Sequence, residues 1–259
     1  MVWITGASSG IGEALVRQFA KENAKIILSS RNEKELQRVA DSAKLNQTNC
    51  LILPFDLADT GNISSHTNKV VEKFGRIDIL VNNGGISQRA YTKDTSLEID
   101  RKIMEVNYFG QIALTKSVLP FMLKQKSGQI VVISSISGKI GFFLRSAYSA
   151  SKHALHGFFD SLRMEILNDN VKVLLVCPGK INTKISINAL TAEGTQHGKL
   201  DESTANGMSA EDCAKRILKA IKNNEEEIYV GQQKQRTALW LKRFFPKLFS
   251  NLIRKQKPE

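Results

Sequence analysis

Cysteine is scarce in this sequence, and its distribution limits the kind of protein the chain can be. The 259 residues include three cysteines, Cys50, Cys177 and Cys213, which are widely spaced and form no C-x-x-C pair. A disulfide-stapled secreted domain or a zinc module needs cysteines in pairs or close sets. We therefore expect buried free thiols in a reducing, cytoplasmic protein, and we expect no metal site.

Long apolar runs are also lacking. No stretch reaches the roughly 18 apolar residues that a membrane-spanning helix needs. The first residues do not combine a basic segment with an apolar core, as a signal peptide would. We expect a chain that is neither secreted nor membrane-spanning. Met1 lies almost on the first expected strand, so an anchor upstream of this chain stays open.

Acidic residues are outnumbered, since 25 Asp and Glu face 37 Lys and Arg and give a net charge of +12. From Lys234 to Glu259 the chain carries eight cations and one acid, which leaves +5 for all other residues. Nucleic-acid binding requires a basic face with stacking aromatics on a recognised module. We expect no nucleic-acid partner, and we regard residues 234–259 as a basic, aromatic tail.

Apolar, β-rich runs alternate with segments of helical periodicity. The runs cover residues 2–5, 25–29, 50–55, 79–82, 129–134, 171–177 and 227–230. The helical segments begin after residue 12 and then cover 33–45, 63–74, 98–122, 149–167 and 210–223. This alternation predicts an α/β fold, a Rossmann-like doubly wound parallel sheet with helices on both faces. With 42% hydrophobic residues and no low-complexity linker, residues 1–233 are expected to form a single domain.

The pentapeptide from Tyr148 to Lys152 places a phenol and an ammonium four residues apart. Residues at i and i+4 share one face of a helix, so both side chains would point into the same site. A free tyrosine, with a pKa of about 10, shuttles protons poorly at neutral pH, and a nearby cation lowers that pKa. Ser135 stands thirteen residues before Tyr148. These residues make Tyr148 a candidate acid or base.

A glycine-rich turn at residues 6–12, Gly-Ala-Ser-Ser-Gly-Ile-Gly, joins the first strand to an amphipathic helix. Glycines permit a tight turn and let a phosphate approach the backbone, and the helix N-terminus adds unpaired N–H groups. We expect a dinucleotide pyrophosphate over residues 8–12. The spacing is G-x-x-x-G-x-G rather than G-x-G-x-x-G, so the turn is specific only in combination with Tyr148 and Lys152.

Taken together, these motifs resemble the short-chain dehydrogenase/reductase family over nearly the whole chain. The matching elements follow the family's order: TGASSGIG at 5–12, Asp56-Leu57, Asn82-Asn83-Gly84-Gly85, Asn107, Ser135, Tyr148 with Lys152, and Pro178-Gly179 with Thr183. The segments NNGGISQR and ISINALTAEG and the basic C-terminus look most like the member 7 and 7B group of that family. Gly85 is a departure, because alanine is usual there.

The resemblance implies an oxidoreductase that transfers a hydride between a nicotinamide dinucleotide and a carbonyl or secondary alcohol. It implies that Tyr148 delivers the proton, that Lys152 lowers the pKa of this tyrosine and binds the nicotinamide ribose, and that Asn107 holds a relay water. Ser135 would hold the substrate oxygen. Ser134 competes for this role, but neighbours on a strand point to opposite faces, and the spacing to Tyr148 selects Ser135. The other expected cofactor-binding residues are Gly6, Ser8, Ser9, Gly10, Ile11, Gly12, Arg31, Asp56, Leu57, Asn83, Gly84, Pro178, Gly179, Ile181 and Thr183.

The choice of dinucleotide depends on the residues about 20 positions past the glycine turn, where a carboxylate would bind a free ribose hydroxyl. The sequence there is Ser29-Ser30-Arg31-Asn32, without a carboxylate. An arginine can donate two hydrogen bonds to a 2′-phosphate. We expect NADP(H) rather than NAD(H).

The substrate is less defined. Arg89, Lys139, Arg145 and Lys180 follow strand ends or flank catalytic elements, and a ring of cations would suit an acidic or phosphate-bearing substrate with an acyl chain. The 7B group is associated with acyl-dihydroxyacetone phosphate, while a steroid, a retinoid or another apolar ketone is equally open. Arg145, Ser135 and Tyr148 are the expected substrate contacts. Residues 184–208 are expected to form a mobile substrate lid, with a plain surface loop as the alternative.

The function and the number of subunits also have alternatives at this point. A catalytically idle NADP(H)-binding scaffold is the alternative function, although the intact set of Asn107, Ser135, Tyr148 and Lys152 argues against it. Family analogy favours a homodimer or homotetramer packed through the helix that carries Tyr148.

Residues 238–253 interleave aromatic and aliphatic side chains with cations, a pattern typical of an interfacial helix, and Pro246 predicts two short segments. Membrane contact and a cap over the pocket or a subunit interface are the alternatives for this tail.

Overall fold

In the computed structural model, which describes residues 1–254 apart from the side chains of Gln233 and Lys234, seven strands form one sheet in the order β3-β2-β1-β4-β5-β6-β9. Every neighbouring pair is parallel. The strands are β1 (Val2–Thr5), β2 (Ile26–Ser29), β3 (Cys50–Ile52), β4 (Ile79–Asn82), β5 (Gly128–Ile133), β6 (Val171–Pro178) and β9 (Glu227–Val230). The chain winds outward from β1 to β3, then returns to β4 on the other side of β1, which confirms the predicted doubly wound fold.

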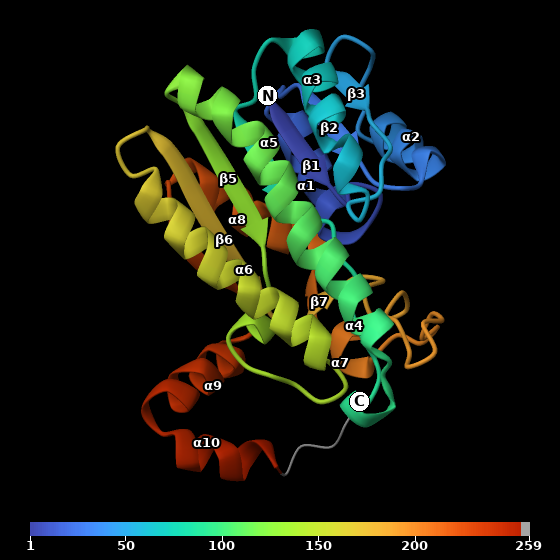
Figure 1. Cartoon of the computed structure of the whole chain (residues 1–259), viewed down its shortest axis with the longest axis vertical. Helices are drawn as coiled ribbons and strands as arrows, with labels where there is room; N and C mark the ends of the chain where they lie inside the picture. The colour runs from blue at the N-terminus through green and yellow to red at the C-terminus, as the bar shows by residue number, and fades with distance from the viewer. Residues whose placement is uncertain (255–259) are drawn as a thin grey trace.

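Helices cover both faces of the sheet (Figure 1). One face packs against α1 (Gly10–Lys21), α2 (Glu33–Ser42) and α8 (Ala210–Lys222), and the other against α3 (Ile63–Phe74), α5 (Gly110–Gln125) and α6 (Ser146–Glu165). Side chains alternate along each strand, so Val2 and Ile4 enter the first core while Trp3 enters the second. Two apolar cores therefore fix the sheet, and the site lies at the edge where the strands end.

The segment predicted as one helix over 98–122 is interrupted. It consists of α4 (Leu97–Met104), a π-helical turn at Glu105–Phe109, and α5. Gly110 packs so closely on Leu57 that a Cβ there would lie 2.2 Å from the Leu57 carbonyl oxygen. The widened turn presents Asn107 to the sheet edge, and such turns often occur at functional sites. Hydrophobic periodicity does not reveal a single extra residue in a helical turn.

Two other helix ends differ from the predicted boundaries. The helix predicted over 33–45 ends at Ser42, because Lys44 takes a left-handed conformation with φ of 55°. The helix predicted from 149 begins at Ser146. Tyr148 consequently lies in the first turn of α6, near the carboxyl end of β5.

Residues 184–208, which we call the substrate loop after the role expected for them, are hydrogen-bonded to the segment after β4. The loop lies between β7 (Ile181–Asn182) and β8 (Met208–Ser209) and contains α7 (Glu202–Ala205). The Arg89 amide donates to the Leu190 carbonyl at 2.8 Å, and the Leu190 amide donates to the Ser87 carbonyl at 2.9 Å. The loop therefore forms one wall at the carboxyl edge of the sheet.

The tail forms two helices, α9 (Gln233–Phe244) and α10 (Pro246–Ile253), as the position of Pro246 predicts. Proline lacks an N–H and is tolerated in the first turn of a helix, so α9 ends and α10 begins around it. Among the described residues, no helix is both long and apolar enough to cross a membrane. The tail cations Lys255 and Lys257 lie outside the described residues.

Candidate functional site

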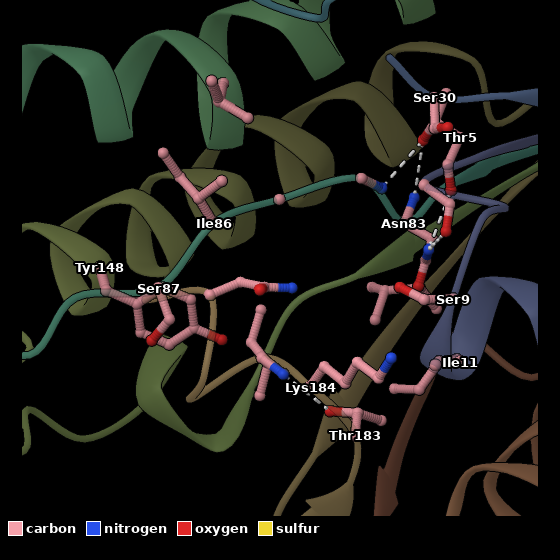
Figure 2. A pocket seen from close by; sticks show the side chains of 18 of the residues that line it. Thr5, Ser9, Ile11, Ser30, Asn83, Ile86, Ser87, Tyr148, Thr183 and Lys184 are labelled. Carbon is pink, nitrogen blue, oxygen red and sulfur yellow. Dashed lines mark hydrogen bonds between the residues drawn. The ribbon is translucent and has the colours of Figure 1, made fainter. Parts of the chain in front are cut away.

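A cleft of about 1200 Å³ opens at the carboxyl ends of the central strands. Its position beside β1 and β4, where the strand order reverses, is where open α/β sheets bind ligands. Figure 2 shows Tyr148 toward one end of the cleft and Ser9, Ser30 and Asn83 toward the other. The expected site residues that line it are Gly6, Ser8, Ser9, Gly10, Ile11, Arg31, Asp56, Leu57, Asn83, Gly84, Ser135, Arg145, Tyr148, Lys152, Pro178, Gly179, Ile181 and Thr183. Gly12 and Asn107 lie behind this wall.

The glycine turn forms a cradle, and side chains in place of its glycines would fill that space. Gly10 has a left-handed φ of 58°, and a Cβ on Gly12 would lie 2.2 Å from the Gly6 carbonyl oxygen. Ser9 precedes α1, and its side chain makes no capping hydrogen bond. The first-turn amides of α1 thus remain available for an anion, together with the positive end of the helix dipole. The cradle fits the pyrophosphate of a dinucleotide.

Asn83 holds the end of β4 against the start of this turn. Its Nδ2 donates to the Thr5 carbonyl at 2.9 Å and to the Gly6 carbonyl at 3.2 Å, and its amide donates to Thr5 Oγ1 at 3.0 Å. The Gly84 amide donates to the same hydroxyl at 3.0 Å. These bonds fix the floor of the cleft between the two central strands.

Arg31 lines the cleft beyond β2, and its side chain is 67% exposed. The Asp56 carboxylate lies beside it, with 3.9 Å between Nη1 and Oδ2. Glu33 and Lys34 also line this end of the cleft, just beyond the segment 29–32 on which the cofactor prediction rests. The guanidinium is therefore accessible to a ligand, and a carboxylate lies two residues along the chain.

Tyr148 and Lys152 share one face of α6, as their spacing predicts. Lys152 Nζ lies 5.9 Å from the centre of the Tyr148 ring and donates to the Ile133 carbonyl at 2.8 Å. The ammonium is therefore fixed between the end of β5 and the phenol. Lys152 is 4% exposed, so its ammonium is largely shielded from water.

Burial dominates the ionisation of both groups. Desolvation raises the pKa of Tyr148 above its usual value, and the hydrogen bond with Ser135 and the charges of Arg145 and Arg89 offset only part of this rise. Desolvation lowers the pKa of Lys152 to about 8. The Tyr148 pKa is therefore raised overall, not lowered as expected, and Lys152 is not among the groups that offset the rise. Both side chains are held nearer their neutral forms.

The two adjacent serines after β5 have different partners. Ser135 Oγ accepts from the Ser137 amide at 3.0 Å and hydrogen-bonds to Tyr148. Ser134 Oγ instead lies 3.0 Å from His156 Nε2 and donates to the Lys152 carbonyl at 3.3 Å. The geometry brings Ser135 to the phenol and ties Ser134 to the body of α6.

Asn107 forms a buried bridge behind Tyr148 and Lys152. Its Oδ1 accepts from the Ile86 amide at 2.8 Å, while its Nδ2 donates to the Ile86 carbonyl at 2.9 Å and to Ser151 Oγ at 3.0 Å. A Cβ on Gly85 would lie 3.0 Å from Asn107 Oδ1 and 3.7 Å from Lys152 Nζ. Gly85 therefore leaves room beside both polar groups, and Asn107 joins the β4 segment to α6.

The predicted ring of cations is only partly present. Arg89 and Arg145 both line the cleft, and both bind the carboxylate of Asp201. Lys139 is not a cleft residue, because its Nζ donates to Glu227 at 2.9 Å outside it. The prediction of four cations at the mouth is therefore wrong for Lys139, and Asp201 offsets one of the two arginine charges.

Asp201, which binds two arginines of the cleft wall, is not predicted from the sequence. Burial raises its pKa, but the hydrogen bond from Arg89 and the charges of Arg89, Arg145 and Lys180 outweigh this and hold it below its usual value. The residue lies in the aperiodic part of the substrate loop, 112 positions from Arg89. No local pattern predicts such a pair.

Comparison with known proteins places this geometry in a family. A family model described as short chain dehydrogenase matches residues 1–194. The chain belongs to the short-chain dehydrogenase/reductase family. A dehydrogenase/reductase SDR family protein 7-like of Anopheles gambiae is 47% identical to it over 261 residues, covering 99% of this chain and 82% of that protein. Mouse dehydrogenase/reductase SDR family member 7B is 42% identical over 257 residues, covering 98% and 80%.

Solved structures agree with this short-chain dehydrogenase/reductase fold. A family member from Burkholderia phymatum in complex with NAD superposes with a TM-score of 0.85 at 22% identity, covering 100% of this chain and 95% of that one. A serine dehydrogenase complexed with NADP⁺ gives a TM-score of 0.81 at 25% identity, covering 89% and 94%. Family membership identifies an oxidoreductase fold that binds a nicotinamide cofactor and takes a small-molecule substrate.

Proposed function

We propose that this short-chain dehydrogenase/reductase is an NADP(H)-dependent enzyme that interconverts a carbonyl and a secondary alcohol. The observation that carries the proposal is the meeting of Tyr148, Ser135 and Lys152 at one end of a cleft whose other end is the glycine cradle. A bound nicotinamide dinucleotide would supply the hydride, with its pyrophosphate over residues 8–12. The protein would supply the proton and the oxygen-binding groups.

Tyr148 acts as the proton donor in the reductive direction. Its raised pKa keeps the phenol protonated, and the Ser135 hydroxyl beside it can donate to the same substrate oxygen. As the carbonyl oxygen gains negative charge, two donors in a desolvated cleft stabilise it better than water would. Lys152 lies where it can stabilise the tyrosinate that remains, and Asn107 positions the segment behind it.

The preference for NADP(H) rests on Arg31. Its guanidinium is exposed in the cleft wall after β2, and no acid stands at positions 29–32 to accept a ribose hydroxyl. Glu33 opposes this preference for NADP(H), because its carboxylate lines the same end of the cleft. We expect Arg31 to have the larger effect on cofactor choice, since an arginine can donate two parallel hydrogen bonds to a phosphate and also has the opposite charge.

For the substrate, we propose a ketone with an apolar chain and an acidic or phosphate group. Lys102, Lys180 and Lys184 line the cleft with Arg145, while Phe142, Ile185 and Leu190 supply apolar wall. Acyl-dihydroxyacetone phosphate combines both features. A steroid or retinoid ketone uses the apolar wall alone.

The test is turnover of both cofactors with a panel of carbonyl compounds that includes acyl-dihydroxyacetone phosphate, a steroid ketone and a retinoid-like ketone. The proposal predicts oxidation of NADPH, with NADH at least about tenfold less effective in kcat/KM. Binding of NADPH without turnover of any compound would identify a scaffold instead. Equal use of NADH would reject the proposed cofactor preference alone.

A further inference from the structure

The two tail helices present a surface on which large apolar side chains remain in water. Five of them, from 48% to 61% exposed, lie within residues 240–252: Trp240, Phe244, Phe245, Leu248 and Leu252. The Trp240 ring lies 5.5 Å from the Phe244 ring and 5.3 Å from the Phe245 ring, so the aromatic residues form one cluster. A cluster of this kind on the surface of a folded protein indicates a contact with something else.

The tail is anchored beside the candidate active site. Gln235, in the first turn of α9, packs on Gly179, where a Cβ would lie 1.8 Å from its Oε1, and Gly179 lines the cleft. Further along α9, Lys242 Nζ donates to the Lys139 carbonyl at 2.7 Å. The apolar cluster is therefore held in a fixed position relative to the cleft.

Other exposed apolar residues share this end of the molecule. Figure 1 shows α9 and α10, in red, at the same end of the long axis as segments 91–97 and 139–145. These segments carry Tyr91, Leu97 and Phe143, each at least 43% exposed. Phe142 of the second segment lines the cleft. The apolar surface and the segment that carries this part of the cleft wall therefore lie at the same end of the molecule.

Charge identifies the partner. Between residues 233 and 254 the chain has six cations, Lys234, Arg236, Lys242, Arg243, Lys247 and Arg254, and no acid. A second copy of this chain docked through the same surface would bring two such sets of like charge together, which is unfavourable. An anionic lipid surface offers opposite charge to the cations and an apolar layer to the aromatic cluster.

We infer that α9 and α10 dock the protein onto the surface of a membrane containing anionic lipid, with the apolar cluster in the interface and the cleft mouth turned toward the bilayer. Docking does not depend on the proposed reaction. Its consequence for catalysis does rest on the proposed function: a substrate with an acyl chain would reach the cleft from the lipid. Vesicle binding is measured without turnover, so the two proposals fail separately.

Intrinsic fluorescence provides a direct reading, because the chain has two tryptophans. Trp3 is fully buried, whereas Trp240 is 55% exposed. Vesicles of phosphatidylcholine with phosphatidylserine should shift the emission to the blue and co-sediment the protein at low salt, and high salt or pure phosphatidylcholine should weaken both. In Trp240→Phe the spectral shift should disappear while co-sedimentation remains.

Paired variants separate the tail from the rest of the surface. Arg243→Gln with Lys247→Gln should weaken partitioning into anionic vesicles by at least about tenfold. Leu248→Ser with Leu252→Ser should weaken it as well. As controls, Lys124→Gln with Lys172→Gln and Met164→Ser with Leu167→Ser remove equal charge and apolar bulk at the other end of the molecule, where α5 and α6 end. These controls should bind as the wild type does.

Three results would overturn the inference. The wild type could fail to bind anionic vesicles at low salt, or the control pairs could lose as much binding as the tail pairs. In the third case the tail variants change the oligomer size in gel filtration while the wild type does not bind lipid. That last result would assign the surface to a contact between subunits.

Discussion

Arg89, in the segment after β4, binds Asp201 of the substrate loop inside the protein. Its Nε donates to both carboxylate oxygens, at 3.3 Å to Oδ1 and 3.1 Å to Oδ2, and the two side chains are 3% and 2% exposed. Arg145, directly before α6, donates to the same carboxylate at 3.0 Å. One acid therefore joins the substrate loop to the helix that carries Tyr148.

Removing that acid should destabilise the fold. Asp201→Asn leaves the buried Arg89 without its counter-charge, and breaking a buried pair in this way costs about 3–5 kcal/mol. Denaturant unfolding measures the change. Asp160→Asn is the matched control, because it breaks the exposed ion pair of Asp160 with Arg163 and should cost at most about 1 kcal/mol. An equally small effect of both substitutions would show that Asp201 does not hold the loop.

The lowered pKa of Lys152 predicts a pH dependence of stability in the protein without cofactor. Between pH 8 and 10.5 the folded protein has released this proton, while the unfolded chain still holds it. The unfolded state then binds more protons, so the free energy of unfolding rises with pH, by up to about 1.4 kcal/mol per pH unit. The buried thiols act in the opposite direction, which calls for a difference measurement.

That measurement compares the wild type with Lys152→Met, which keeps a side chain of similar length and has no titrating group. Burial raises the pKa of Cys50, Cys177 and Cys213, and their contributions are common to both proteins. The stability of the wild type relative to the variant should increase from about pH 8 to about pH 10. A constant difference would mean that Lys152 titrates as an exposed lysine does.

Arg31→Asp should reverse the preference for the cofactor. The new carboxylate repels a 2′-phosphate and can accept from a free ribose hydroxyl, so affinity for NADPH should fall at least about tenfold while that for NADH rises. Equilibrium binding of both cofactors measures the change. Lys21→Asp, at the end of α1, makes the same change in net charge away from the cleft and should leave both affinities as they are. If Arg31→Asp also leaves them unchanged, Arg31 does not contact the cofactor.

Local patterns predicted the parts of this molecule that depend on neighbouring residues. The turn at residues 6–12 and the shared face of Tyr148 and Lys152 follow from short-range spacing, and so does the break at Pro246. The contact of Arg89 with Asp201 does not, because it joins positions 112 apart in the sequence. Glu33 was overlooked for another reason: it is the first residue of α2, just beyond the segment 29–32 that was taken to select the dinucleotide, and it lines the cleft wall.

The direction of the Tyr148 pKa shift also required the structure. Spacing alone shows a cation near a phenol, which favours ionisation. It does not show that both groups are enclosed, and enclosure is the larger effect on each. The same limit applies to Lys139, which the sequence places close to the catalytic elements and the fold directs to Glu227.

The most direct test of the central claim compares Tyr148→Phe with the wild type on a ketone that the wild type reduces with NADPH. Exposed Tyr91→Phe serves as the control. The account predicts that Tyr148→Phe binds NADPH as the wild type does but loses at least about a hundredfold in kcat, because the ring remains and the proton donor is gone. Tyr91→Phe should turn over normally. A Tyr148→Phe enzyme with the kcat of the wild type would contradict the assignment of Tyr148 as the proton donor.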